Sequence, residues 1–316
     1  MKILVTGGSG YVGSVLIPKL LKKNYKIISI DTQWFGNFLP KHKNLKNINI
    51  NINDIDKIKI KGVDTIIHLA SIANDPMVEL KKNLSWETSA LGTLKLLNYA
   101  IKNKVRRIIY SSSGSVYGVK SDLRVHEELS LNPLSLYNKV KMVTERVLMS
   151  FQNKIEVFIV RPATICGYSP RMRFDLTVNA LTFSALKKGI ITVYGGKQIR
   201  PNIHIDDMTD LYLYFIKIKK KYSGIYNAGF ENSSIVKIAN DISKVVNTQI
   251  KIIKNSNDPR SYRLDSSKLI NLGFKPKKKY IDAILELKQI FLQRKLKDNP
   301  RFHSVRWLKN NKNLIK

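Results

Sequence analysis

Residues 2–13 read KILVTGGSGYVG, and this stretch decides the fold of the chain. The apolar run at 3–5 predicts a buried strand, and an apolar helical pattern begins directly after the glycines. Gly7 permits a tight turn, Gly10 lets a pyrophosphate approach the backbone, and Gly13 lets the helix pack closely on the strand. The start of that helix offers free backbone N–H groups to phosphates. Strand, turn and helix in this order therefore predict a dinucleotide-binding unit.

A second apolar run at residues 26–30 predicts another strand, and it ends in Asp31. An acidic side chain there can accept hydrogen bonds from both ribose hydroxyls, which favours NAD over NADP. The alternating stretch NININI at 47–52 predicts an exposed edge strand. We expect the loop with Asp54 and Ile55 to reach the adenine, although Asp54 can equally be a simple turn acid.

Strands and helices continue to alternate through the first half of the chain. The next predicted elements are a strand at 63–69, a helix over 86–102 and a strand at 107–111. This alternation predicts a doubly wound parallel sheet, in which ligands lie outside the carboxyl ends of the strands. Leu69, Ala70 and Ser71 follow one such strand, where small side chains leave room for a cofactor.

The sequence SSSGSVYG at 111–118 places hydroxyl groups at the end of another strand. A serine-rich turn is the alternative interpretation. On the helix expected next, Tyr137 and Lys141 are four residues apart and therefore share a face. The ordinary pKa of a tyrosine is about 10. A neighbouring cation favours the phenolate, which would let Tyr137 act as a general base.

Asn132 is expected to cap this helix, with Pro133 at its first position. An apolar stripe recurs along the helix at spacings of three and four residues, and we expect it to be buried. The stripe consists of Leu136, Val140, Val143, Val147 and Phe151.

These motifs together resemble the extended short-chain dehydrogenase/reductases, and more narrowly the NAD-dependent epimerase/dehydratase group that acts on nucleotide-diphosphate sugars. TGGSGYVGS at 6–14 is similar to the opening of UDP-glucose 4-epimerases, and RPNIHIDDM at 200–208 also matches. The resemblance extends to about residue 290 and implies NAD as the cofactor. It also implies an α/β fold: a Rossmann-type doubly wound sheet over 1–165 with a return segment near 200–228, and a smaller substrate-binding domain with a basic tail over 166–316.

The resemblance implies a role for each matching residue. Tyr137 would be the catalytic base or acid, Lys141 would hold the nicotinamide ribose, and Ser113 would steady the sugar oxygen. The implied cofactor-binding residues are Gly7, Gly10, Tyr11, Val12, Gly13, Asp31, Asp54, Ile55, Leu69, Ala70, Ser71, Tyr137 and Lys141. The implied substrate-binding residues are Ser113, Tyr137, Asn179, Arg200 and Arg260. Arg200 suits the diphosphate because a guanidinium offers several fixed donors.

The implied reaction is epimerisation by transient oxidation at the sugar C4, and we find no metal-ligand cluster in the sequence. A 4-keto-sugar reductase using NAD(P)H remains the alternative, and a non-catalytic nucleotide- or nucleic-acid-binding protein is a more distant one. Gly114 and Ser115 stand where dehydratases of the family carry acids, which argues against 4,6-dehydration. Ser89 replaces a family asparagine and is expected to weaken a helix distortion near the site.

The formal net charge of +32 would suit a nucleic-acid-binding protein. The lysines are spread along the chain among abundant Ile and Asn, so we interpret the charge as background composition and expect no nucleic-acid partner. The single Cys166 suits a reducing cytoplasm, and no apolar stretch is long enough for a membrane span. A homodimer is implied by the resemblance. His68, His204 and Cys166 are interpreted as structural, and the tail after 293 as docked or disordered.

Overall fold

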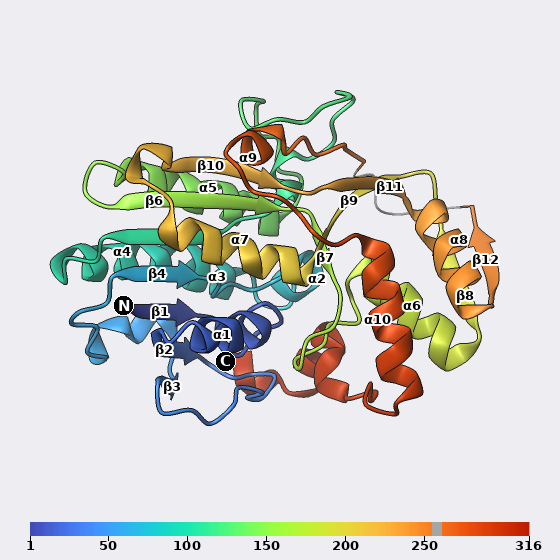
Figure 1. The fold of residues 1–316 in the computed structure, drawn as a ribbon, viewed down its shortest axis with the longest axis horizontal. Coiled ribbons are helices and arrows are strands. Elements are labelled where there is room, and N and C mark those ends of the chain that lie inside the picture. The colour runs from blue at the N-terminus through green and yellow to red at the C-terminus, as the bar shows by residue number, and fades with distance from the viewer. Residues whose placement is uncertain (255–260, 316) are drawn as a thin grey trace.

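The computed structural model describes residues 1–254 and 261–315. Figure 1 shows a large sheet with helices on both faces, and a smaller group of helices and short strands beside it. The large sheet comes almost entirely from the first half of the chain, and the smaller group from the second half.

Seven parallel strands form the main sheet in the order β10-β6-β5-β4-β1-β2-β3. Their bounds are β1 Lys2–Thr6, β2 Lys26–Asp31, β3 Leu45–Asn49, β4 Thr65–His68, β5 Arg107–Ser111, β6 Glu156–Pro162 and β10 Gly224–Ala228. From β1 the chain moves out to β2 and β3 and then returns to β4 on the other side. The carboxyl ends of β1 and β4 therefore flank the point where the order reverses, which is where such sheets bind ligands. The predicted doubly wound sheet is confirmed.

The central strands are apolar because both of their faces are covered. The covering helices are α1 (Gly13–Lys22) and α7 (Ile205–Lys217) on one face, and α4 (Gly92–Lys102) and α5 (Leu136–Ser150) on the other. Ile3 and Val5 pack into the first layer and Leu4 into the second, as the alternation of a strand requires. All three side chains are fully buried.

β3 is one of the two edge strands of the main sheet, and none of its residues is fully buried. The alternating stretch at 47–52 therefore predicted an edge strand correctly, although the strand itself spans Leu45–Asn49. Beyond it the chain turns into a short 3-10 helix, η1 (Ile52–Lys57), which is capped by the side chain of Asn51.

The helix predicted over 86–102 is interrupted. It comprises α3 (Lys82–Ser85), a π-helical turn η2 (Trp86–Leu91) and α4. Ser89 lies in the π-helical turn, and its carbonyl accepts hydrogen bonds from the hydroxyls of Thr93 and Thr144. The helix is therefore distorted at Ser89, and the two threonines satisfy the carbonyl that the distortion exposes.

α5 begins at Leu136, and Ser135 caps it by accepting a hydrogen bond from the backbone N–H of Asn138 (3.2 Å). The predicted cap, Asn132, lies in the irregular segment before the helix. That prediction is wrong because Asn and Ser are both good caps, and Pro133 led us to place the start of the helix too early.

The buried face of α5 is largely polar. It consists of Asn138, Val140, Lys141, Thr144, Glu145 and Leu148. Of the predicted apolar stripe only Val140 is buried, and the other members are half-buried. The helix turns its polar side inward because hydrogen-bond partners lie there. Lys141 donates to the carbonyl of Ser111, and Glu145 accepts the hydroxyl of Ser112.

The second half forms two small sheets, of order β11-β9-β7 and β12-β8, packed with helices. The bounds are β7 Thr164–Cys166, α6 Thr177–Lys188, β8 Ile190–Tyr194, β9 Ile199–His204, β11 Glu231–Ser234, α8 Ile235–Val246, β12 Gln249–Ile253 and α10 Tyr280–Leu292. Short elements are α2 Asp75–Val78, η3 Gly114–Tyr117, η4 Lys220–Tyr222, α9 Ser267–Asn271, η5 Pro300–Phe302, α11 Ser304–Asn310 and η6 Lys312–Ile315. Cys166 is fully buried, which raises the pKa of its thiol and supports a packing role.

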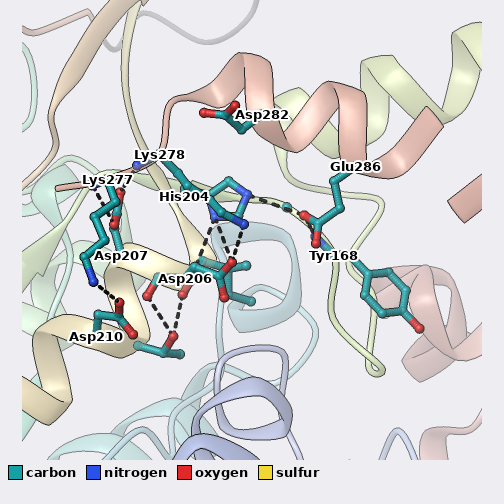
Figure 2. A network of polar contacts seen from close by, with 12 residues as sticks. Tyr168, His204, Asp206, Asp207, Asp210, Lys277, Lys278, Asp282 and Glu286 are labelled. Carbon is teal, nitrogen blue, oxygen red and sulfur yellow. Dashed lines mark hydrogen bonds and ion pairs between the residues drawn. The ribbon is translucent and has the colours of Figure 1, made fainter. Parts of the chain in front are cut away.

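Figure 2 shows the polar network that joins α7 to α10. His204 caps α7 because its Nδ1 accepts the backbone N–H of Asp206 (3.1 Å). Its Nε2 lies 3.4 Å from the carboxylate of Glu286 on α10, and that carboxylate accepts the backbone N–H of Tyr168 (3.2 Å). His204 is therefore structural.

The same network continues toward the main sheet. Asp207 is buried and accepts the backbone N–H groups of Lys277 and Lys278, each at 2.9 Å. Asp206 forms ion pairs with Lys278 (2.6 Å) and with Lys19 of α1 (3.0 Å). The start of α7 thus ties the segment before α10 to α1.

His68 is also structural, as the sequence predicted. Its ring lies between the hydroxyls of Thr6 (2.6 Å) and Thr93 (2.8 Å). Burial lowers the pKa of His68 to about 3, so the ring is neutral.

Residues 300–315, which we call the C-terminal strap, dock on the first half of the chain. Leu308 and Ile315 are buried in an apolar cluster with Met77 and Val78 of α2. The indole N–H of Trp307 donates to the carbonyl of Trp34 (2.7 Å). Of the two alternatives for the tail, the structure shows docking.

Candidate active site

One cavity of about 540 Å³ lies at the carboxyl ends of the central strands. Residues of the glycine-rich turn, Tyr137 and Arg200 all line it. Its wall contains most of the predicted site residues: Gly7, Gly10, Tyr11, Val12, Gly13, Asp31, Leu69, Ala70, Ser71, Ser113, Tyr137, Lys141 and Arg200. Residues predicted for a cofactor and for a substrate therefore share one space.

The glycine-rich turn is pressed against the end of β4. Gly7 has a φ of +72°, and a Cβ there would lie 2.7 Å from the backbone nitrogen of Ala70. A Cβ on Gly13 would lie 2.6 Å from the Cα of Gly8. Val12, the N-cap residue of α1, makes no side-chain hydrogen bond to the first N–H groups of the helix, and it lines the cavity. The turn thus needs its glycines and presents a helix N-terminus to an anion.

Asp31 is held rigidly at the cavity wall. Its two carboxylate oxygens accept the backbone N–H groups of Ser9 (3.0 Å) and Gln33 (2.7 Å). Burial raises the pKa of Asp31, and these two hydrogen bonds oppose the rise. Each oxygen keeps lone pairs for the hydroxyl groups of a ligand.

The structure does not bring Asp54 and Ile55 to the cavity, where Asn51 and Ile52 lie instead. Ile55 is in the core at 1% exposure, and Asp54 pairs with Lys57 at 2.7 Å. The reason is the turn of η1, which leads the chain away from the wall after Ile52.

Tyr137 and Lys141 lie one helical turn apart on α5. The ammonium of Lys141 is 5.8 Å from the ring centre of Tyr137 and 4.8 Å from that of Tyr110, and it donates to the carbonyl of Ser111 (2.7 Å). Burial lowers the pKa of Lys141 to about 7. A cation held this close to the phenol favours proton transfer to and from Tyr137.

Ser113 stands at the end of β5 and caps η3. Its hydroxyl accepts the backbone N–H of Ser115 (3.2 Å) and lies 2.7 Å from the hydroxyl of Ser115. Both serines line the cavity together with Tyr137. The structure therefore brings the three predicted catalytic side chains to one wall.

A buried ion pair supports this wall from behind. Arg161 of β6 donates to Glu145 of α5 (2.7 Å) and to the hydroxyl of Tyr117 (2.8 Å). Burial opposes the charge of Arg161, but the hydrogen bonds and charge of Glu145 raise its pKa. Glu145 also accepts the hydroxyl of Ser112, the neighbour of Ser113.

Sequence reasoning missed Arg171, which is 3% exposed and lines the cavity. Its guanidinium lies 4.1 Å from the ring centre of Phe35 and donates to the hydroxyl of Ser304 in the strap (2.9 Å). Its Nε has no hydrogen-bond partner in the described part of the chain. Burial and then the neighbouring Arg173 lower the pKa of Arg171 to about 9. The only signal was the basic sequence SPRMRFD at 169–175.

Asn179 does not line the cavity. It is fully buried, its carbonyl oxygen accepts the backbone N–H of Gly167 (3.0 Å), and its NH2 donates to the hydroxyl of Tyr11 (3.0 Å). The structure therefore shows it bracing the turn and the loop after β7. Arg200 lines the cavity, and Arg260 lies outside the described residues.

Within residues 1–254 and 261–315, no group of three or more His, Cys, Asp or Glu side chains could hold a metal ion. No helix in the same ranges is long and apolar enough to cross a membrane.

A nucleotide-binding turn and a Ser–Tyr–Lys group in one cavity define an enzyme of the short-chain dehydrogenase/reductase class. Within it, the chain belongs to the NAD dependent epimerase/dehydratase family, whose model matches residues 3–229. The cradle around Gly7 and Gly13, the uncapped start of α1 and the oriented Asp31 all fit the dinucleotide of the family's name.

Known relatives match most of the chain. It is 25% identical to a UDP-glucose 4-epimerase of Lactobacillus helveticus, over 90% of this chain and 95% of that protein. It is 29% identical to UDP-glucuronic acid decarboxylase 6 of Arabidopsis thaliana, over 92% and 89%. A solved structure of UDP-glucuronic acid 4-epimerase from Bacillus cereus, in complex with UDP-glucuronic acid and NAD, superposes with a TM-score of 0.80 at 26% identity, covering 93% of this chain and all of that one.

Proposed function

We propose that this protein is an NAD-dependent epimerase of a uridine-diphosphate sugar that acts by transient oxidation at C4. The observation that carries the proposal is the single cavity in which Ser113, Tyr137 and Lys141 lie beside the glycine-rich turn. Similarity to the L. helveticus 4-epimerase and the B. cereus 4-epimerase structure supports the substrate class.

The side chains of this wall divide the proton chemistry. Tyr137 takes the proton of the sugar hydroxyl and later returns it, while the ammonium of Lys141 stabilises the phenolate between the two events. Ser113 donates a hydrogen bond to the sugar oxygen when it becomes a carbonyl. NAD, when bound, supplies hydride transfer from the sugar and back to its other face, so the reaction is redox-neutral overall.

The remaining wall residues would bind and orient. The glycine-rich turn and Asp31 would hold the dinucleotide, with Leu69, Ala70 and Ser71 along its path and Arg171 as an added cation. Arg200 would bind the diphosphate of the substrate, and Arg260 is a further candidate. Asn179 would act only by holding the loop after β7.

The first experiment identifies the nucleotide released from the denatured, purified protein. Stoichiometric NAD supports an epimerase, because internal redox cycling needs no exchange of cofactor. An empty site that binds NADPH reversibly would instead favour the 4-keto-sugar reductase, and it would contradict the role of Asp31.

Turnover is then tested by NMR on UDP-glucose, UDP-N-acetylglucosamine and UDP-glucuronic acid. Tyr137→Phe should reduce kcat by at least about a thousandfold, because the general base is lost. The variant should keep its NAD content, which serves as the control for folding. Full activity in Tyr137→Phe would disprove the proposed mechanism.

We further propose a homodimer. The apolar stripe of α5 is only half-buried, and Leu91 before α4 is 55% exposed, so this side of the sheet keeps apolar surface for a second copy. Light scattering coupled to size exclusion tests this directly, and a monomer at micromolar concentration would exclude it.

A further inference from the structure

A chain of three polar side chains leads from the cavity into the buried face of α5. The hydroxyls of Ser113 and Ser115 are 2.7 Å apart, and the hydroxyl of Ser115 donates to Oδ1 of Asn138 (2.5 Å). Both serines line the cavity, whereas Asn138 is fully buried beneath them.

The protons in this chain can be counted. Each serine hydroxyl has one proton to donate. Because Ser115 gives its proton to Asn138, the proton between the two serines comes from Ser113. In this direction Ser113 has no proton left for a ligand in the cavity.

The reaction proposed above needs the opposite direction. When Tyr137 removes its proton, the sugar oxygen becomes a carbonyl that can only accept, so Ser113 must donate to it. If Ser113 turned alone, its oxygen and that of Ser115 would face each other at 2.7 Å without a proton between them. That contact is repulsive, so the whole chain must reverse.

An amide can end the chain in either direction. Its oxygen accepts, and its nitrogen donates after a rotation of about 180°. Nδ2 of Asn138 has no hydrogen-bond partner among the described residues, so the rotation breaks only the bond to Ser115. After the rotation, Asn138 donates to Ser115, Ser115 to Ser113, and Ser113 into the cavity.

We propose that Asn138 is a positioning residue that acts through Ser115 to set the direction of the Ser113 hydroxyl. The inward direction belongs to the free site and the outward direction to the bound carbonyl. This inference rests on the proposed function, because it assigns the outward direction to a sugar carbonyl.

The test replaces the amide at the end of the chain, which can accept or donate a hydrogen bond, with a group that can only accept one. In Asn138→Asp the ionised carboxylate can only accept, which fixes the chain in the inward direction. We expect kcat to fall at least about tenfold where the new carboxyl is ionised, with little change in KM. Activity should recover as the pH falls and the carboxyl, once protonated, can donate again. Asn153→Asp, an exposed change beyond the end of α5, adds the same charge and should behave as wild type.

A double-mutant cycle separates this effect from a direct action of the new charge on Tyr137 or Lys141. In a Ser115→Ala background the chain is already cut, so Asn138→Asp should change kcat less than about twofold. Ser115→Thr keeps the hydroxyl and should recover most of the activity that Ser115→Ala loses. Equal effects of Asn138→Asp in both backgrounds would overturn the proposal.

Folding and function are checked independently of turnover. Each variant is assayed for its thermal midpoint and its NAD content. If Asn138→Asp does not fold, Ser115→Ala is compared with Ser115→Thr instead. Equal kcat values for these two variants would overturn the proposal. If the wild-type protein converts no nucleotide sugar, the proposed function itself is contradicted. If the wild type is active and Asn138→Asp keeps full kcat at every pH, the role of Asn138 is contradicted and the proposed function stands.

Discussion

At the scale of single residues, Lys141 holds an almost fully buried amino group in the wall of the cavity. Burial lowers the pKa of Lys141 to about 7, whereas the same group titrates near 10.5 in the unfolded chain. Between these values the unfolded state binds more protons, so the free energy of unfolding rises with pH. Below pH 7 both states are protonated, and the full destabilisation by the buried charge is present.

Lys141→Met should remove this pH dependence from the protein freed of cofactor. The stability of wild type relative to the variant should increase between pH 7 and pH 10 by on the order of a few kcal/mol. Urea denaturation at several pH values measures it, with the exposed Lys139→Met as the control. A difference between wild type and Lys141→Met that stays constant with pH would show that Lys141 is solvated.

At the scale of elements, α5 is fastened to β6 by the ion pair between Glu145 and Arg161. Both side chains are 3% exposed. Glu145→Gln leaves a buried guanidinium without its counter-charge and should lower the free energy of unfolding by about 3–5 kcal/mol. Asp54→Asn breaks the exposed pair with Lys57 and should change it by less than about 1 kcal/mol. Equal urea midpoints for the two variants would contradict this account.

The same helix shows which spatial relations can be predicted from a sequence and which cannot. Tyr137 and Lys141 were found because their relation is local, one turn of one helix. The buried face was missed because Glu145 goes inward only to meet Arg161, which arrives from another strand. The glycine-rich turn and Asp31 were predictable because they belong to a local pattern of strand, turn and helix. Arg171 was missed because its contacts come from distant parts of the chain.

At the scale of the whole molecule, the C-terminal strap completes the cavity. Ser304 and Val305 lie in its wall, and Leu308 is 1% exposed beneath them. This could not be predicted because Trp307 bonds to Trp34, a contact that no local pattern encodes.

Leu308→Ala should therefore loosen the strap and speed the release of NAD. The thermal midpoint of the core should change little. The rate is measured from the fluorescence of reduced cofactor after dilution. Leu314→Ala, at a side chain 37% exposed in the same strap, is the matched control. Identical release rates for the two variants would show that the strap does not retain the cofactor.

The strap also sets an order of events during synthesis. The ribosome makes the chain from its amino end, so the glycine-rich turn emerges well before Ser304. The nucleotide-binding half can collapse around a dinucleotide while the strap is still being polymerised. A dinucleotide that reaches the site at that stage meets a wall without Ser304 and Val305, so the strap does not oppose its entry.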